Sequence, residues 1–154
     1  MIEVNEKIEV DAEPQRVWDL LSDPRAVVEC VDGAALGEQN EDGTYDASIT
    51  VKFGPAKVAF RAKVELVMDA AARTGHVISR GKDKQGGARF ETKMSFKVEE
   101  RADPPGAVIP IVASVDISGR LASVIETGAS LVVKRMTKDF SERLANRLAG
   151  ADAS

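Results

Sequence analysis

The sequence predicts an α+β fold in which a curved antiparallel sheet of seven strands covers one long C-terminal helix. Two observations predict it: three stretches alternate apolar and polar side chains, and a late segment carries apolar residues three and four positions apart. Because side chains alternate across a strand, each alternating stretch is a strand with one buried and one wet face. The dry face needs a cover, which residues 121–148 supply as an amphipathic helix.

The strands are expected in order along the chain. The alternating stretches are residues 45–53, 58–68 and 90–98, and alternation also predicts strands at 2–10 and 109–117. Weaker strands are expected near Leu36 and at residues 76–82. The turns Asp42-Gly43 and Gly54-Pro55 connect neighbours into a meander.

Two short helices are expected after the first strand. Asp11 is expected to cap the first with its side-chain oxygen, and Pro14 suits the first turn because it has no amide hydrogen to satisfy. Ser22-Asp23-Pro24 ends this helix and begins a second one that reaches about Val28.

The bulk properties predict one soluble globular domain, residues 1–154. Apolar residues make up 44% of the chain, charged residues 30%, and the net charge is -4, which argues against a nucleic-acid partner. The single cysteine cannot form an internal disulfide, and no leader is apparent, so a cytoplasmic location is expected. The longest apolar stretch, residues 107–113, is too short to cross a bilayer.

This order of elements is the helix-grip arrangement of START-like (SRPBCC) lipid carriers, pollen-allergen-like proteins and polyketide cyclases, and the fold alone does not choose among them. Four stretches, residues 17–24, 29–33, 45–55 and 117–122, resemble the family of CoxG, the G subunit of carbon monoxide dehydrogenase. The most specific are the turn with Cys30, the Gly-Pro after the third strand and the Gly-x-Leu-Ala at the helix start. The family usually has proline where this chain has Asp32.

The resemblance implies association with a molybdenum hydroxylase of the carbon monoxide dehydrogenase type. The association would serve maturation, membrane recruitment or the handling of a lipophilic electron carrier such as a quinone. Many family members anchor to the membrane through a C-terminal extension, whereas this sequence stops at Ser154, just after the helix. Any membrane contact is therefore expected to be peripheral, at the inner face.

The sequence offers no set of catalytic or metal-binding residues. His76 is the only histidine and has no evident partner, and Cys30 has no basic neighbour close in sequence to activate its thiol. Asp116 and Glu126 fall on wet faces. We expect no catalytic residue, no metal site and no cofactor other than a bound quinone or lipid.

The dry faces instead suggest a ligand cavity. Their flexible or flat side chains suit an isoprenoid tail or a planar ring, although a filled core is the alternative. Gly128 lies inside the helix, where glycine costs about 1 kcal/mol relative to alanine, which indicates a packing or access role. The expected cavity residues are Phe53, Phe60, Met68, Phe90, Met94, Phe96, Gly128, Val132, Met136 and Phe140.

Basic residues crowd the end of the long helix. Their ordinary role is to stabilise the negative helix terminus, and the alternative is docking to an acidic protein or to anionic lipid heads. They are Lys134, Arg135, Lys138, Arg143 and Arg147.

Three functions remain open. The first is a non-enzymatic accessory protein that binds a lipid or quinone-like molecule, and the second is a cyclase- or dehydratase-like enzyme using His76, Tyr45 or a cavity carboxylate. The third is an interaction protein with a filled core. An apolar tunnel would favour the first, a polar residue at the cavity floor the second, and the absence of a cavity the third.

Overall fold

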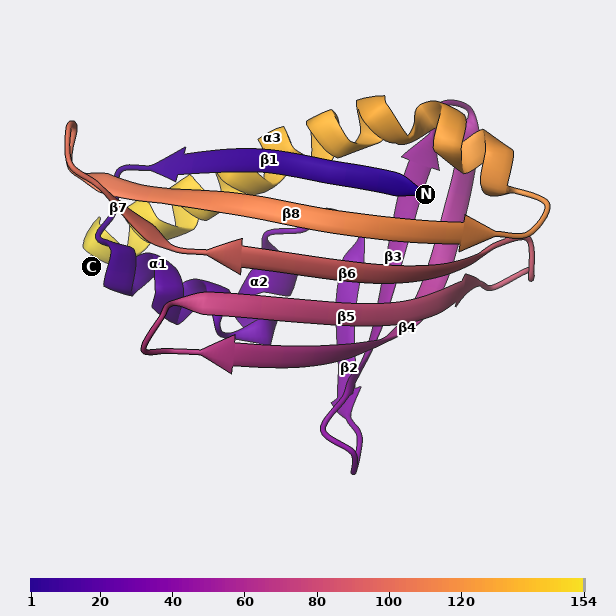
Figure 1. Ribbon diagram of the computed structural model, residues 1–154, viewed down its shortest axis with the longest axis horizontal. Helices are drawn as coiled ribbons and strands as arrows, with labels where there is room; N and C mark the ends of the chain where they lie inside the picture. Colours follow the sequence, from indigo (N-terminus) through magenta and orange to yellow (C-terminus); the bar gives the residue numbers. More distant parts are fainter. Residues whose placement is uncertain (154) are drawn as a thin grey trace.

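The computed structural model describes residues 1–153 and contains one antiparallel, unclosed sheet that bends around a long helix (Figure 1). The hydrogen-bonded order is β1-β8-β6-β5-β4-β3-β2, and the short β7 pairs with β8 beside β6. The strands are β1 Ile2–Val10, β2 Ala34–Gln39, β3 Tyr45–Phe53, β4 Ala56–Asp69, β5 Thr74–Asp83, β6 Arg89–Lys97, β7 Glu99–Arg101 and β8 Gly106–Ser118. The helices are α1 Pro14–Leu21, α2 Pro24–Glu29 and α3 Ala122–Ala153.

The predicted fold class and element order are confirmed. The inward residues of the alternating stretches lie opposite one another across the sheet, as in the row Val4, Ala113, Met94, Val77 and Leu66. One strand was not expected: the chain leaves β6 at the buried Val98 and resumes pairing with β8 as β7. Figure 1 shows β2 and β3 running across the direction of β5, β6 and β8, so the sheet curves strongly.

The start of α1 differs from the expectation. Its N-cap residue is Glu13, whose side chain makes no capping hydrogen bond, and Asp11 instead forms an ion pair with Arg101. The prediction of Asp11 as the cap was therefore wrong. A cap at Asp11 would start the helix at residue 12, whereas α1 starts two residues later, at Pro14. Asp23 does cap α2, accepting a hydrogen bond from the Arg25 amide at 3.1 Å.

Two glycines of β5 make room for aromatic rings of β6. A Cβ atom on Gly75 would lie 2.4 Å from the Phe96 ring, and one on Gly81 would lie 2.5 Å from the Phe90 ring. Each glycine is directly opposite the phenylalanine that covers it. The rings can therefore lie flat along the sheet, where a side chain on β5 would push them toward the helix.

α3 contacts the sheet at its two ends through different hydrophobic clusters. Near its start, Ile125 and Val132 pack directly on Phe53 and Phe60 of the sheet. Near its end, Leu144 and Leu148 pack on Val17, Trp18 and Leu21 of α1, which in turn contact the sheet.

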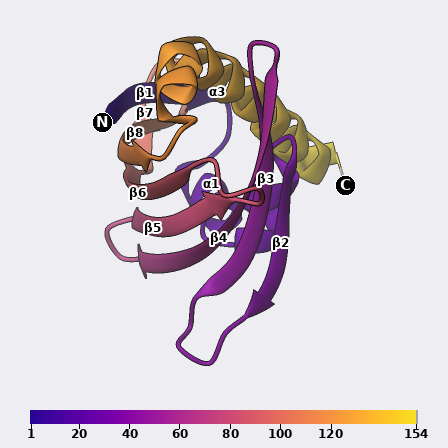
Figure 2. The same cartoon turned by 90° about the vertical axis from the view of Figure 1, so that its right-hand side faces the viewer.

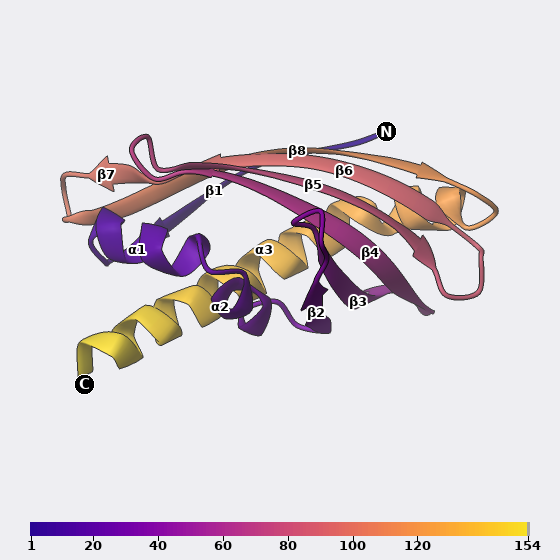
Figure 3. The ribbon, with the colours of Figure 1, turned by 90° about the horizontal axis from the view of Figure 1, so that it is seen from below.

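The short helix α1 therefore lies between the sheet and the last turns of α3. Figure 3 shows all three helices on one side of the sheet, with α3 diverging from it toward the C-terminus. Figure 2, viewed along β5, β6 and β8, shows α3 running diagonally from beside β1 to beyond β3. Arg16 of α1 links the two helices by donating to the Leu148 carbonyl oxygen at 2.8 Å.

Candidate functional site

A cavity of about 430 Å³ lies between the sheet and the middle of α3, between the two clusters. Its floor is the central row of the sheet, which includes Val4, Ala113, Met94, Val77 and Leu66. Its walls come from α2, α3 and the ends of β2 and β3. A volume of this size lies within the usual range of small-molecule sites, about 300–1,000 Å³.

The cavity lining is almost entirely apolar. Tyr45 and Thr137 supply its only polar side chains among the described residues, and no carboxylate, histidine or cysteine lines it. The remaining lining residues are Val4, Ile8, Leu21, Pro24, Val27, Val28, Val31, Leu36, Ala47, Val64, Leu66, Met68, Val77, Met94, Phe96, Ile109, Ile111, Ala113, Val133, Met136 and Phe140. Such a lining favours apolar ligand surface and offers few groups for proton transfer.

The structure divides the expected cavity residues into two groups. Five of them line the cavity: Met68, Met94, Phe96, Met136 and Phe140. The other five lie in or against the cluster under the first turns of α3: Phe53, Phe60, Phe90, Gly128 and Val132. In that cluster the rings of Phe60 and Phe90 pack edge to face, with their centroids 5.1 Å apart, so this part of the dry face is filled.

The helical wall was not expected from the sequence. Pro24, Val27, Val28 and Val31 belong to α2 and the turn after it. Their spacing of three and four residues marks an apolar helix face, but a six-residue helix gives too short a pattern to separate a cavity wall from core.

The residues considered for catalysis do not meet in the cavity. His76 is exposed on the outer face of the sheet, beside Val67 and Val112, while its neighbour Val77 points into the cavity. Cys30 is buried, and burial raises the pKa of its thiol above the ordinary value of 9.0. Asp116 and Glu126 are exposed, as expected.

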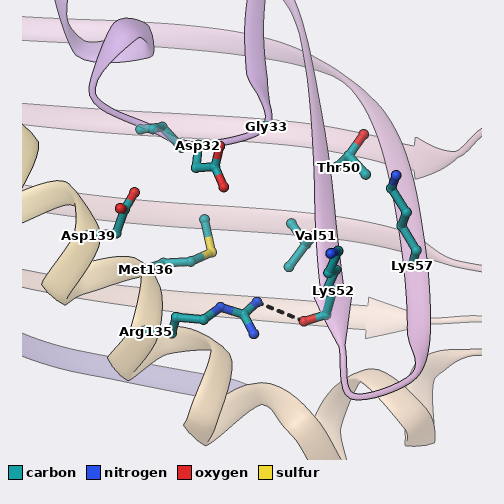
Figure 4. A pocket seen from close by; sticks show the side chains of 10 residues that line it. Asp32, Gly33, Thr50, Val51, Lys52, Lys57, Arg135, Met136 and Asp139 are labelled. Atoms are coloured by element: carbon teal, nitrogen blue, oxygen red, sulfur yellow. Dashed lines mark hydrogen bonds between the residues drawn. The ribbon is translucent and has the colours of Figure 1, made fainter.

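A second, polar pocket of about 530 Å³ adjoins the cavity (Figure 4). Val31 and Met136 line both spaces, so these two side chains stand between them. Figure 4 shows Met136 between Asp139 and Val51, with Arg135 extending from α3 to β3. The remaining lining residues are Asp32, Gly33, Thr50, Lys52 and Lys57.

Gly33 closes this pocket where α2 passes into β2. Its φ is +80°, and a Cβ atom there would lie 2.5 Å from the Thr50 carbonyl oxygen. The Thr50 amide donates to the Gly33 carbonyl oxygen at 3.0 Å. Only glycine fits this close approach, and its neighbour Asp32 lines the pocket.

The basic residues of α3 serve different purposes. Arg143 pairs with Asp139 at 3.0 Å and with Asp32 at 3.6 Å, and Arg147 pairs with Glu29 of α2, which raises the pKa of Arg147. These two arginines therefore join α3 to the α2 region. Lys134 and Lys138 are exposed and form no ion pair within the described part of the chain.

The family model for CoxG, the G subunit of carbon monoxide dehydrogenase, matches residues 7–149. This range contains all the residues that line the cavity except Val4. The chain belongs to the CoxG family. No curated protein sequence matches the chain.

Several solved structures share the fold of this CoxG protein. A conserved protein from Geobacillus kaustophilus is 18% identical with a TM-score of 0.83, and 97% of each chain is covered. A protein from Thermus thermophilus is 14% identical with a TM-score of 0.68, covering 97% of this chain and 99% of that one. The Zhui aromatase/cyclase from a Streptomyces species is 13% identical with a TM-score of 0.61, covering 96% and 93%. These similarities show the helix-grip fold.

Two features are absent from the described residues. No helix there has the length and apolar character needed to span a membrane. No three His, Cys, Asp or Glu residues in that part of the chain are grouped so that they could hold a metal ion.

Proposed function

We propose that this CoxG protein is a non-enzymatic accessory protein that binds a hydrophobic small molecule, lipid or quinone-like, between the sheet and α3. One observation carries the proposal: a cavity of about 430 Å³ whose only polar side chains, among the described residues, are Tyr45 and Thr137. Binding would be driven by burial of apolar ligand surface, at about 0.8 kcal/mol for each buried methylene. Each added methylene should therefore tighten binding about fourfold until the cavity is full.

The test uses protein freed of bound lipid and a neutral apolar fluorescent probe. One probe should bind per monomer and be displaced by quinone-like and long-chain ligands. Met136→Trp should weaken this binding at least tenfold, because Met136 stands between the cavity and the outer pocket. Leu131→Trp is the matched control, since Leu131 is 77% exposed on the opposite side of α3.

Two results would contradict the proposal. If the wild type binds no probe and native mass spectrometry of the freshly purified protein shows no bound molecule, the filled-core alternative is correct. If a folded Met136→Trp protein binds the probe as the wild type does, the ligand occupies another site.

The partner proposed for this carrier is a molybdenum hydroxylase of the carbon monoxide dehydrogenase type, as expected from the family. The carrier would act in the cytoplasm and contact the membrane peripherally, exchanging a lipophilic molecule between bilayer and enzyme. Co-elution of the carrier with the hydroxylase of the same organism in size-exclusion chromatography is the test. Separate elution at micromolar concentrations of both proteins would count against this partner.

A second candidate is a cyclase- or dehydratase-like enzyme, favoured by Tyr45 in the cavity lining and by the shared fold with an aromatase/cyclase. His76 cannot act in this cavity, because it lies on the opposite face of the sheet. Tyr45→Phe separates the candidates. A carrier should keep its probe affinity within about twofold, whereas an enzyme using Tyr45 as general acid should lose about a hundredfold in turnover.

A further inference from the structure

The polar pocket beside the cavity carries excess positive charge. Lys52, Lys57 and Arg135 line it together with two carboxylates, Asp32 and Asp139. Both carboxylates already pair with Arg143, at 3.6 and 3.0 Å. Counting Arg143, four cations therefore face two anions, and the group carries a net charge of +2.

The fold does not require the two lysines of this group. Lys52 and Lys57 are directly opposite each other on β3 and β4, and like charges in that position destabilise a sheet. Among the described residues, neither lysine has an Asp or Glu oxygen within 4.0 Å. Both lysines are exposed, so solvent screens part of this repulsion, and an anion between them would reduce it further.

Arg135 is held in a position to join them. It donates one hydrogen bond to the Lys52 carbonyl oxygen at 2.9 Å. This oxygen belongs to the part of β3 that does not pair with β2. A guanidinium group has five N–H donors, so others remain for an acceptor in the pocket. The next residue along α3 is Met136, whose side chain also lines the apolar cavity.

We propose that the ligand is an amphiphile with an anionic head group, a carboxylate or a phosphate monoester. The head group lies in the outer pocket against Lys52, Lys57 and Arg135, and the apolar chain passes Val31 and Met136 into the cavity. This inference rests on the proposed function and specifies the class of ligand. A neutral lipid or quinone would fill the cavity without using the three cations.

The experiment compares ligands of equal chain length and different head groups. Lipid-free protein is titrated with dodecanoate, dodecyl phosphate and dodecanol by displacement of the neutral probe, at low and at physiological salt. The two anionic ligands should bind about tenfold more tightly than the alcohol at low salt, which corresponds to about 1.4 kcal/mol. The difference should shrink as salt screens the exposed lysines.

The variant Lys52→Gln/Lys57→Gln should remove this difference and leave the affinity for dodecanol unchanged. Lys7→Gln/Lys97→Gln is the matched control, because it removes the same charge from exposed positions on β1 and β6 that line neither space. The control should keep the tenfold difference. Inorganic phosphate alone should bind at least a hundredfold more weakly than dodecyl phosphate.

The outcomes separate this inference from the proposed function. Equal binding of dodecanoate and dodecanol by the wild type would overturn the anionic head group and leave the hydrophobic carrier intact. Inorganic phosphate binding as tightly as dodecyl phosphate would indicate a site for free anions and would also overturn the inference. Failure of all three long-chain ligands to bind would overturn both proposals.

Discussion

Filling the cavity with a larger side chain should stabilise the lipid-free protein and abolish ligand binding. Ala113 is the smallest residue of the central row, points inward from β8 and lines the cavity floor. Ala113→Leu adds three carbon atoms, worth up to about 2.4 kcal/mol when buried. Holding the leucine costs about 0.5–1 kcal/mol in rotamer freedom, so the expected net gain is about 1–2 kcal/mol.

Urea denaturation of lipid-free protein measures this gain, and probe titration measures the loss of binding, which should exceed tenfold. The matched control is Ala107→Leu, on the same strand and the same face but within the filled cluster, where Ala107 is fully buried. The control should lose about 1–3 kcal/mol from overpacking. If Ala113→Leu is destabilised like Ala107→Leu, the space over the central row is closed in solution and the cavity argument fails.

Three other predictions follow from particular contacts. Gly128→Ala should raise the unfolding free energy by about 0.5–1 kcal/mol in urea titration, because alanine favours the helix and its Cβ atom would make an ordinary contact with Phe53 at 3.5 Å. A loss of stability would show that the space between Gly128 and Phe53 tolerates no methyl group. Cys30 should react slowly with a thiol reagent at pH 8 and rapidly in urea, and rapid reaction of the folded protein would refute its burial. Because burial raises the pKa of the thiol, Cys30 should contribute to stability below pH 9.0 and lose this contribution as the pH rises through the higher pKa of the folded state. In sedimentation assays, anionic vesicles should bind the protein weakly at low salt and release it at high salt. Lys134→Gln/Lys138→Gln should lose up to about 2 kcal/mol of binding free energy. Binding that survives both high salt and this double substitution would point to an apolar contact such as the exposed Leu131.

The strands and the long helix could be predicted because each element carries its own pattern. β1 begins and ends at the residues where alternation predicts it, and the inward set of β8 includes the buried Ile109 and Ala113. The distinction between filled and open parts of the dry face could not be predicted in this way. Phe60 and Met94 both face inward on long strands, yet one lies in packed core and the other lines the cavity.

This difference between filled and open parts of the dry face depends on the position of α1. The apolar periodicity of α3 does not indicate where α1 packs. Trp18 packs against Phe96 at 6.1 Å and, with Leu144, belongs to the cluster that lies between the sheet and the last turns of α3. At the other end, Ile125 and Val132 of α3 pack directly on the sheet in the cluster that contains Phe53. The helix is thus close to the sheet at one end and separated from it at the other, and the space between depends on contacts distant in sequence.

The size of the cavity also bears on what fills it. Engineered cavities cost about 24 cal/mol for each Å³, so a rigid, dry void of about 430 Å³ would cost about 10 kcal/mol. A typical domain is stable by only about 5–15 kcal/mol, so such a void would consume most of the stability of this fold. The space is open to solvent on one side, so it contains water or a ligand. Water finds few partners against a lining whose polar groups are Tyr45 and Thr137, whereas an apolar chain restores the missing contacts. A ligand at a hundred times its dissociation constant would add about 2.7 kcal/mol of stability, so removing bound lipid should lower the melting temperature by several degrees.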